Sequence, residues 1–523
     1  MPAIGMLLGV DQSTPQRSER GHRLALALPL AVIFVLSGAA FALLTLAPER
    51  IFAWDGLYHI KFAYLLRTES IVSTLRWLPF TIGGELGVDH HWLFHVLLIP
   101  FTFGDLVLGL KWAMIIYGAL AVTIFYWVLR QMRVPWPTIF TLLLVATGAP
   151  FILRLLMGRA GTIALPLMLL FVLFLRESRW LALCATTYIL TLAYGITVIL
   201  GPLVVIALGA QLAVERRVEW RALLYTAFGI LLGLVANPYF PNNFEFMLFI
   251  TLFKFSASTG STRIGAEWAP YDTWNALSLF WPLWLAISGS LIHSLARRIR
   301  WSLDSWTLFA MFVFFLVFFL RHSRFFEYAV PFGAFFCGLY WRDALAPPLS
   351  TGSVEGSSSM RPPIGLSPAI DRRIVAALFV VGIALGAQRL VAAREGIDRF
   401  GANPDAMKDE ALWLERHTPK DAIVFNLRYD TFPYLFLHNH HNRYVTGLEP
   451  LWMRYTSPKR FEIYNAMVWS GRYKGNYVET LAKEFRSRFV VGPRSKALFK
   501  HFRKKGFKTR LIGRGGFVLE APN

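Results

Sequence analysis

Long apolar runs dominate the hydrophobic pattern of this chain. A membrane-spanning helix requires about 20 predominantly apolar residues, and runs near this length recur along most of the sequence. They lie at residues 24–46, 105–128, 138–156, 161–175, 180–197, 199–214, 221–237, 275–294, 304–320, 325–343 and 373–391. The pattern predicts a mainly α-helical, polytopic membrane protein with about 11 transmembrane helices.

The basic residues between these runs indicate an orientation. If residues 1–23 are cytoplasmic, every second connection carries arginine, as the positive-inside rule requires. These arginines are Arg130, Arg133, Arg176, Arg179, Arg216, Arg217, Arg221, Arg297, Arg298, Arg300, Arg342, Arg361, Arg372 and Arg373. The same rule predicts two large outer loops, at 47–104 and 238–274, and an outer location for the chain after residue 391.

The chain changes character after the tenth apolar run. Residues 344–372 are rich in Ser, Pro and Gly, so we expect a disordered cytoplasmic linker before the last span at 373–391. In residues 392–523, helical periodicity alternates with strand-like stretches such as NRYVTGL and SRFVVG, and KTRLIGRGGFVLEA has the pattern of a hairpin. This region predicts a small extracytoplasmic α/β domain.

The composition excludes several classes of protein. Of the 523 residues, 55% are apolar and 16% are charged, which argues against a soluble protein. The net charge of +21 follows from arginine in the cytoplasmic loops and lacks the interleaved aromatic pattern of a base-stacking groove, so no nucleic-acid partner is expected. Cys184 and Cys337 lie inside apolar runs and predict neither a disulfide nor a metal site.

The first outer loop opens with the sequence RIFAWDGLYHIKFAYLLRTES. Apolar residues from Leu57 to Tyr64 have helical spacing, which predicts an interfacial helix whose Lys61 reaches the lipid headgroups. A second apolar stretch, 92–103, is too short to span and is expected at the outer face. Asp55 directly precedes the first helix. It is expected to be a helix N-cap, worth about 1 kcal/mol, and a capping aspartate on a fixed helix is also a well-positioned one.

The layout of a long first span, an outer loop containing WDGLYHIK, interfacial helices and an outer C-terminal domain resembles the GT-C superfamily of membrane glycosyltransferases. The stretch DGLYHIK, Asp55 to Lys61, resembles the aspartate–aromatic–basic pattern in the first outer loop of oligosaccharyltransferases. Protein mannosyltransferases and aminoarabinose transferases belong to the same superfamily. The resemblance implies a GT-C-like transmembrane domain at 24–343, a polyprenyl-phosphate-linked sugar donor, and Asp55 as the catalytic base.

One segment departs from the oligosaccharyltransferase pattern. In those enzymes the second outer loop carries a further acidic, metal-binding motif. The matching place here, residues 153–162, reads LRLLMGRAGT and contains Arg154 and Arg159 but no acid. The sequence is closer to metal-independent members in this respect, and no cofactor is expected to be required. The alternative is a divalent cation, Mg²⁺ or Mn²⁺, held by Asp55 and Asp89.

Transfer from a lipid phosphate requires cations that hold the leaving phosphate. Outer arginines are suited to this because guanidinium binds phosphate bidentately, although the sequence RHSRFFEY also fits headgroup binding and a helical ion pair. The second large outer loop is expected to cover the site as a lid. It contains Glu267, which is either a functional residue or only a polar loop residue. The candidate substrate-binding residues are Tyr58, His59, Lys61, Asp89, His91, Arg154, Arg159, Glu267, Arg321, Arg324 and Glu327.

The resemblance implies a glycosyltransferase, and the charge pattern predicts a cytoplasmic N-terminus and a periplasmic or extracellular C-terminal domain. We expect the protein in a bacterial inner (plasma) membrane. The expected partners are a polyprenyl-phosphate sugar donor, membrane lipids and an acceptor glycan, lipid or protein. Two alternatives stay open: an oligosaccharyltransferase or glycan ligase that transfers a whole glycan, and a lipid or polysaccharide transporter or flippase. The middles of the spans carry almost no charge, which favours surface chemistry over transport.

Overall fold

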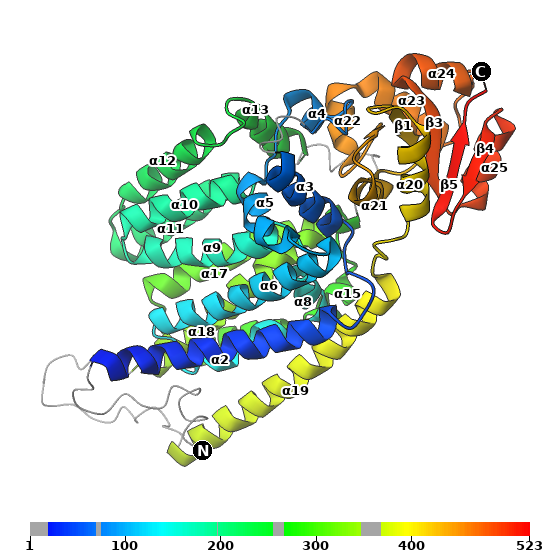
Figure 1. Cartoon of the computed structure of the whole chain (residues 1–523). Coiled ribbons are helices and arrows are strands. Elements are labelled where there is room, and N and C mark those ends of the chain that lie inside the picture. The colour runs from blue at the N-terminus through cyan, green and yellow to red at the C-terminus, as the bar shows by residue number, and fades with distance from the viewer. Residues whose placement is uncertain (1–18, 70–74, 196, 255–265, 347–367, 523) are drawn as a thin grey trace, which may run out of the picture.

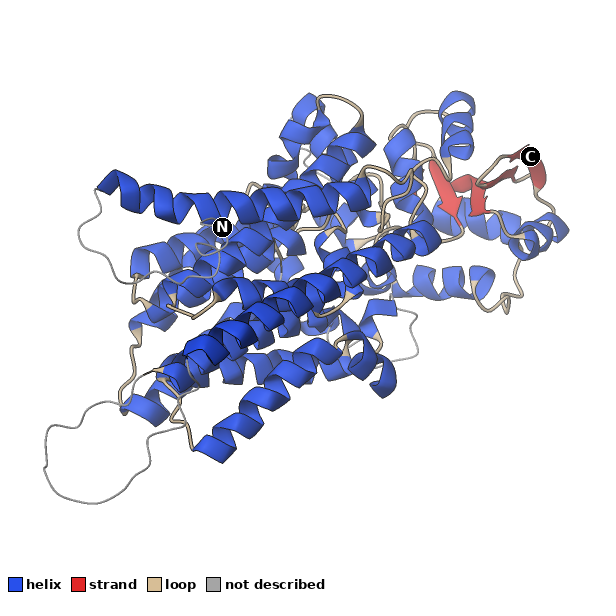
Figure 2. Cartoon of the chain, turned by 90° about the horizontal axis from the view of Figure 1, so that it is seen from below, coloured by secondary structure: helices blue, strands red, loops and turns tan. Residues whose placement is uncertain are grey.

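The computed structural model describes residues 19–69, 75–195, 197–254, 266–346 and 368–522. Helices form a bundle whose long members run in roughly a common direction, and a small sheet lies at one end of it (Figures 1 and 2). Most of two predicted segments, the N-terminal 1–23 and the linker 344–372, lies outside the described residues.

Each predicted apolar run forms a helix or a pair of helices. The bundle contains α2 (Glu19–Thr45), α6 (Leu106–Gln131), α7 (Pro137–Ala146), α8 (Ala149–Leu155), α9 (Gly161–Arg176), α10 (Trp180–Ala193), η2 (Thr197–Ile199), α11 (Leu200–Glu215), α12 (Arg221–Val235), α15 (Thr273–Leu279), α16 (Trp281–Arg297), α17 (Leu303–Arg321), η5 (Ser323–Phe325), α18 (Phe326–Leu345) and α19 (Pro368–Phe400). The mainly helical character predicted from the sequence is confirmed.

The predicted number of spans is not confirmed. Among the described residues, five segments are long and apolar enough to cross a membrane: α2, α6, η2–α11, α17 and α19. The number is seven if the bent pairs α7–α8 and α15–α16 each count as one span. The helices α9, α10 and α12 are apolar but shorter, at 14–16 residues. An apolar run marks burial in protein as well as in lipid, so apolar runs alone do not fix the number of spans. The chain is a multi-pass membrane protein.

The sharpest bend in the bundle separates α7 from α8 by 95°. It occurs at Gly148, where a Cβ atom would lie 2.6 Å from the carbonyl oxygen of Leu279. The absent side chain therefore lets the α15–α16 junction approach the bend closely. Because of this bend, α8 leaves the direction of α7 and carries Arg154 toward the outer loops.

The segments predicted as outer loops form short helices. They are α3 (Asp55–Glu69), α4 (Ile82–Leu86), α5 (Trp92–Leu98), η1 (Ile99–Thr102), α13 (Asn242–Leu248), the π-helix η3 (Phe249–Lys254) and η4 (Ala266–Trp268). The helix α3 lies between the bundle and the C-terminal domain (Figure 1). Leu57 and Ile60 join the bundle core, whereas Tyr58 and Phe62 join a second core shared with the C-terminal domain.

This placement corrects the expectation that Lys61 of α3 reaches the lipid headgroups. Lys61 is only 7% exposed and does not reach outward to headgroups. Arg67 donates hydrogen bonds to the side chain and carbonyl of Thr102, at 2.9 and 3.1 Å. The helix is apolar on opposite faces because it packs between two protein layers.

The C-terminal region contains α20 (Lys408–His417), β1 (Ile423–Asn426), η6 (Tyr429–Thr431), α21 (Phe432–His438), β2 (Arg443–Tyr444), α22 (Pro450–Thr456), α23 (Pro458–Val468), α24 (Tyr477–Phe485), β3 (Ser487–Pro493), α25 (Lys496–Lys504), β4 (Lys508–Ile512) and β5 (Gly516–Glu520). The strand order is β2-β1-β3-β5-β4. The pairs β1–β2 and β1–β3 are parallel, and β3–β5 and β4–β5 are antiparallel. The predicted strands and the closing hairpin are confirmed.

Candidate active site

A cavity of about 460 Å³ lies where the bundle, the outer loops and the C-terminal domain meet. Its bundle side comes from α8, the α8–α9 turn and the start of α18. Its other sides come from α3, the loop before α5, η4 and the loops around η6 and α22. The polar and charged residues that line it are Asp55, Tyr58, His59, His90, His91, Arg154, Arg159, Thr162, Tyr194, Glu267, Arg324, Glu327, Tyr328, Arg428, Tyr429, Asp430 and Glu449.

Two glycines bring the first outer loop against the α8–α9 turn. Gly158 has a φ of +65°, a conformation that favours glycine. A Cβ atom there would lie 3.2 Å from the Cα of Gly56 and 2.8 Å from Leu110 Cδ1. Because neither glycine carries a side chain, their neighbours Asp55 and Arg159 can meet. The contact between Gly56 and Gly158 thus brings together Asp55 and Arg159, which the sequence analysis placed on separate loops.

Arg159 bridges two carboxylates. Its Nη2 group forms an ion pair with Asp55, and its Nη1 group donates to Glu267 Oε2 at 2.8 Å. The helix α3 begins at Asp55 itself, and among the described residues the carboxylate is bound by Arg159 rather than by backbone N–H groups of its own helix. The N-cap interpretation of Asp55 is therefore not the arrangement observed.

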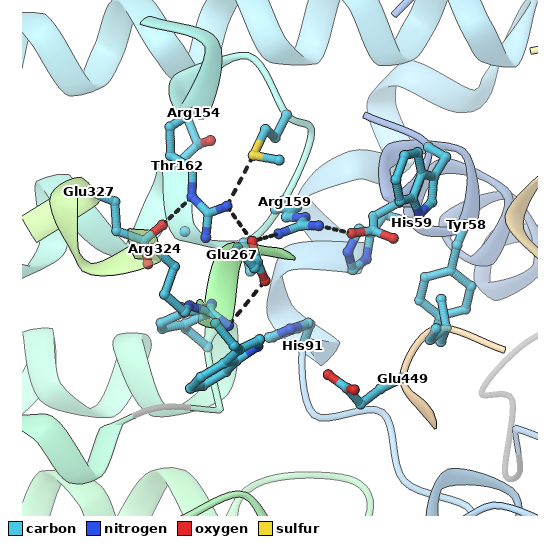
Figure 3. Close-up of a pocket in the computed structure, with 18 of the residues that line it drawn as sticks. Tyr58, His59, His91, Arg154, Arg159, Thr162, Glu267, Arg324, Glu327 and Glu449 are labelled. Atoms are coloured by element: carbon cyan, nitrogen blue, oxygen red, sulfur yellow. Dashed lines mark hydrogen bonds and ion pairs between the residues drawn. The ribbon is translucent and has the colours of Figure 1, made fainter. Parts of the chain in front are cut away.

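Glu267 collects two more guanidinium groups (Figure 3). Arg154 Nη1 donates to Glu267 Oε2 at 2.8 Å, and Arg324 Nη1 donates to Glu267 Oε1 at 3.3 Å. The Nε group of Arg154 also donates to Glu327 Oε2 at 2.5 Å. Three arginines thus face three carboxylates around one cavity, and this set forms the charged cluster of the site.

Local backbone contacts hold Glu267 in this position. The His322 ring donates from Nδ1 to the carbonyl oxygen of Trp268 at 2.8 Å, and the Ser323 hydroxyl donates to the carbonyl oxygen of Glu267 at 3.1 Å. The Arg324 guanidinium lies over the Trp268 ring, 4.7 Å from its centre. The turn before α18 therefore fixes η4 and its glutamate beside the arginines.

The electrostatics of the cluster favour a charged Glu267 and leave room for a ligand. Burial alone would raise the pKa of Glu267, but Arg159, Arg324 and Arg154 outweigh it and hold the pKa well below its usual value. Two buried atoms, Arg159 Nε and Glu327 Oε1, have no hydrogen-bond partner among the described residues. Buried polar atoms are almost always paired, so the cluster has hydrogen-bonding capacity that its own residues do not fill.

The opposite side of the cavity carries a chain of buried polar groups. His59 Nδ1 lies 2.7 Å from His95 Nε2, and His95 Nδ1 lies 2.6 Å from Asp89 Oδ2. The backbone N–H of His91 donates to Asp89 Oδ1 at 2.9 Å. The His91 ring stacks on Tyr194, with 5.6 Å between centres and 10° between planes. Of the three hydrogen-bonded side chains Asp89, His95 and His59, it is His59 that lines the cavity.

The C-terminal domain supplies cavity residues that the sequence analysis missed. Arg428 and Asp430 face one another across the turn at η6, with 2.9 Å between Nε and Oδ1. Glu449 and Trp452 come from the start of α22, and both line the cavity. No local motif marks these residues, because they approach Asp55 only through the packing of α3 against α21 and its neighbours.

The structure brings together most of the residues predicted for the site. Nine of them line one cavity: Asp55, Tyr58, His59, His91, Arg154, Arg159, Glu267, Arg324 and Glu327. Three do not line it. Lys61 is buried under the C-terminal domain, Arg321 is exposed at the end of α17, and Asp89 lies behind His95.

A metal site at Asp55 and Asp89 does not fit this arrangement. Asp89 is occupied by His95 and by the His91 N–H group, and it does not line the cavity with Asp55. Asp55 faces the guanidinium of Arg159, a position that repels a cation. Within the described ranges, no group of three or more His, Cys, Asp or Glu residues is arranged to hold a metal ion.

Comparison with known proteins gives matches in fold. No family model matches the chain, and no curated protein matches its sequence. The apo oligosaccharyltransferase of Archaeoglobus fulgidus aligns at 12% identity over 94% of this chain and 74% of its own, with a TM-score of 0.61. ArnT from Cupriavidus metallidurans, bound to undecaprenyl phosphate, aligns at 14% over 97% and 100%, with a TM-score of 0.56. The mycobacterial arabinofuranosyltransferase AftD aligns at 14% over 97% and 40%, with a TM-score of 0.57.

These proteins are GT-C glycosyltransferases, so the chain has the GT-C fold, and the predicted resemblance is confirmed at the level of fold. The archaeal oligosaccharyltransferase AglB has also been solved with an inhibitory peptide and a dolichol-phosphate. At identities of 11–14%, the likeness describes the fold. The fold alone does not define the reaction, which depends on the residues of the cavity.

Proposed function

We propose that this protein is an integral membrane glycosyltransferase that moves a sugar from a polyprenyl-phosphate donor to a lipid, glycan or protein acceptor. The observation that carries the proposal is the cavity in which three arginines and Asp55 meet at the junction of an apolar bundle and a polar domain. A lipid tail and a polar sugar can meet only at such a junction. We place this junction at the extracytoplasmic face of a bacterial inner membrane, with the C-terminal domain periplasmic or extracellular and the N-terminus cytoplasmic.

The arginines form the donor half of the site. Arg154, Arg159 and Arg324 are held together by Glu267, and an anionic phosphate, like a bridging carboxylate, presents oxygens that accept paired hydrogen bonds from guanidinium groups. A donor phosphate would replace Glu267 as their partner and would also bind the open Nε group of Arg159. The polyprenyl phosphates bound to AglB and to ArnT support a ligand of this class.

Asp55 forms the acceptor half of the site. Once the donor phosphate draws Arg159 away, the Asp55 carboxylate is free to act as the base. The proton of the acceptor O–H group passes to Asp55 as that oxygen bonds to the anomeric carbon. The anomeric carbon–oxygen bond to phosphate breaks, and the polyprenyl phosphate leaves with the electron pair, stabilised by the arginines.

The test follows the leaving group, so it requires neither the sugar nor the acceptor to be known. Purified protein in nanodiscs is incubated with a mixed pool of bacterial polyprenyl-phosphate sugars and a membrane acceptor extract, and free polyprenyl phosphate is measured by mass spectrometry. We expect release to fall on the order of 10²-fold or more in Asp55→Asn. The matched control is Asp105→Asn, because Asp105 caps α6 outside the cavity. No release by the wild type, or equal release by Asp55→Asn, contradicts the proposal.

Two neighbouring arginines separate phosphate binding from headgroup binding. Arg324 is buried in the cavity, whereas Arg321 is exposed three residues earlier. We expect Arg324→Ala to weaken binding of undecaprenyl phosphate roughly tenfold, since a charge-assisted hydrogen bond contributes about 1.5–3 kcal/mol. Arg321→Ala should leave binding unchanged. Equal losses in both variants would assign the two arginines to lipid headgroups.

A further inference from the structure

The buried chain Asp89–His95–His59 fixes the position of protons from one end to the other. An ionised carboxylate only accepts hydrogen bonds, so the nitrogen of His95 that faces Asp89, Nδ1, carries a proton. In a neutral imidazole the second nitrogen is then an acceptor. His95 Nε2 therefore accepts from His59 Nδ1–H across 2.7 Å. The remaining nitrogen of His59, Nε2, then carries no proton. His59 is the member of the chain that lines the cavity.

The surroundings keep this chain dry and His59 neutral. The side chains of His95 and Asp89 are each 1% exposed, and Phe94 packs edge-on against His59 with 5.3 Å between ring centres. Burial lowers the pKa of His59 well below its usual value, and His95, His91, Arg159 and His90 lower it further. Between neighbouring histidines and a guanidinium group, a second positive charge is unfavourable. His59 therefore presents a lone pair rather than a positive charge.

We propose that Asp89 and His95 are positioning residues that fix His59 as a hydrogen-bond acceptor for a hydroxyl group of the carbohydrate ligand. This inference rests on the proposed function. The phosphodiester of a sugar-bearing donor is ionised at neutral pH and has no proton to donate to His59 Nε2, whereas a sugar offers many O–H donors. The arginine side of the cavity and the histidine side thus select opposite parts of one ligand (Figure 3). The phosphate lies against the arginines, and a hydroxyl group lies against His59.

The chain makes a specific prediction for Asp89→Asn. The Oδ1 atom of residue 89 accepts from the His91 N–H group, so an asparagine that keeps this bond turns its NH₂ group toward His95. His95 Nδ1 must then accept, and His95 Nε2 must carry the proton and donate to His59 Nδ1. His59 Nε2 becomes a donor. A single change of one oxygen to an NH₂ group, outside the cavity, reverses the hydrogen-bonding character of His59.

The experiment is ¹⁵N NMR of histidine-labelled protein in nanodiscs, which reports the protonation of each ring nitrogen without any substrate. The chain has 12 histidines, and the signals of His59 and His95 are assigned by their absence from the spectra of His59→Gln and His95→Gln. We expect unprotonated Nε2 at His59 in the wild type and protonated Nε2 in Asp89→Asn. The control His90→Gln changes a neighbouring ring outside the chain and should leave the pattern intact. A protonated His59 Nε2 or a His95 imidazolium in the wild type, or no reversal in Asp89→Asn, overturns the proposal.

A second measurement asks whether the hydroxyl belongs to the donor or to the acceptor. Native mass spectrometry compares the binding of bare undecaprenyl phosphate with that of the mixed sugar-bearing pool. If the donor sugar supplies the hydroxyl, the sugar-bearing polyprenyl phosphate binds roughly 2- to 10-fold more weakly to His59→Gln and to Asp89→Asn than to the wild type. Binding of bare undecaprenyl phosphate is then the same in all three proteins. If the acceptor supplies it, donor retention is unchanged and only the release rate falls. If neither retention nor release changes, the hydroxyl contact is wrong, whatever the histidine spectra show. Failure of wild-type protein to bind any carrier would instead refute the proposed function.

Discussion

Two clusters of charged side chains lie at the two ends of α18, and they differ in how completely they are satisfied. At the end of the helix, Asp343 accepts from the Ser302 N–H at 2.7 Å, the Ser305 hydroxyl at 2.6 Å and Arg342 at 3.0 Å. Arg342 also binds Asp304 at 2.9 Å. At the beginning of the helix, Glu327 binds Arg154 but leaves Oε1 without a partner among the described residues.

The difference distinguishes a structural cluster from a site. Removing charges from water is costly, and the cost is recovered only when the geometry is good and each polar atom is paired. The cluster around Arg342 meets this condition and joins α17 to α18. The cluster around Glu267 does not meet it without a ligand, and it faces a cavity. Incomplete pairing of buried charges that also line a cavity therefore marks a place where a ligand can complete the network.

The largest effect on stability is expected at the satisfied cluster. Arg342→Ala leaves Asp343, whose side chain is 8% exposed, without its cation. It also takes one of two arginines from Asp304, which is 15% exposed and keeps Arg176 at 3.2 Å. Loss of one partner from a buried pair costs about 3–5 kcal/mol, so we expect a clearly lower midpoint of thermal unfolding in nanodiscs. Arg324→Ala should cost less, because Glu267 keeps Arg154 and Arg159. If the cavity variant is the less stable of the two, the distinction between the clusters is wrong.

Gly158→Ala tests the backbone contact beneath the cavity cluster without changing any charge. Alanine at a positive φ costs about 1–3 kcal/mol in strain, and its Cβ would press on Leu110 and Gly56. We expect a loss of stability in this range and a larger loss of polyprenyl phosphate release, since Arg159 moves relative to Asp55. Gly104→Ala is the control, because nothing lies within 4 Å of its Cβ position. Unchanged release per folded molecule would mean that the Asp55–Arg159 pair is not needed.

The sequence predicted much of this arrangement because local patterns carry it. Apolar runs marked the bundle helices, alternating stretches marked β3 and the β4–β5 hairpin, and polar residues in outer loops marked Asp55, Arg159 and Glu267. These properties depend on neighbours in the chain, and burial in either lipid or protein selects them. The same ambiguity explains why the span count could not be read from apolar runs.

The remaining features depend on contacts between distant segments. Glu449 and Trp452 line the cavity only because the C-terminal domain packs on α3, and nothing near them in the chain indicates this. Lys61 has the spacing of a headgroup-binding residue, but the domain above it buries it. The role of Asp89 was also hidden, because its partner His95 is six residues away and their bond depends on the turn before α5.

Glu267→Gln removes one carboxylate charge from the incompletely paired cluster at the cavity. Glutamine removes the negative charge that competes with a donor phosphate for three arginines. We expect tighter binding of undecaprenyl phosphate, by roughly tenfold or about 1.4 kcal/mol, measured by native mass spectrometry at several lipid concentrations. Asp304→Asn at the satisfied cluster should leave this affinity unchanged. Weaker binding in Glu267→Gln would show that the glutamate itself contacts the ligand.

The smallest expected effect is on the pH dependence of stability. The pKa of Glu267 lies well below its usual value in the folded protein because burial is outweighed by the three arginines. Its contribution to stability is therefore complete above the unfolded pKa of about 4.3, and it is lost as the pH falls toward the folded pKa. The midpoint of unfolding of the wild type should drop more steeply below pH ~4 than that of Glu267→Gln, while the difference between them stays constant from pH ~6 to pH ~8. Parallel curves at acidic pH would mean that the arginines do not hold Glu267 ionised, and the cavity cluster would then be open to phosphate without displacement of a charged partner.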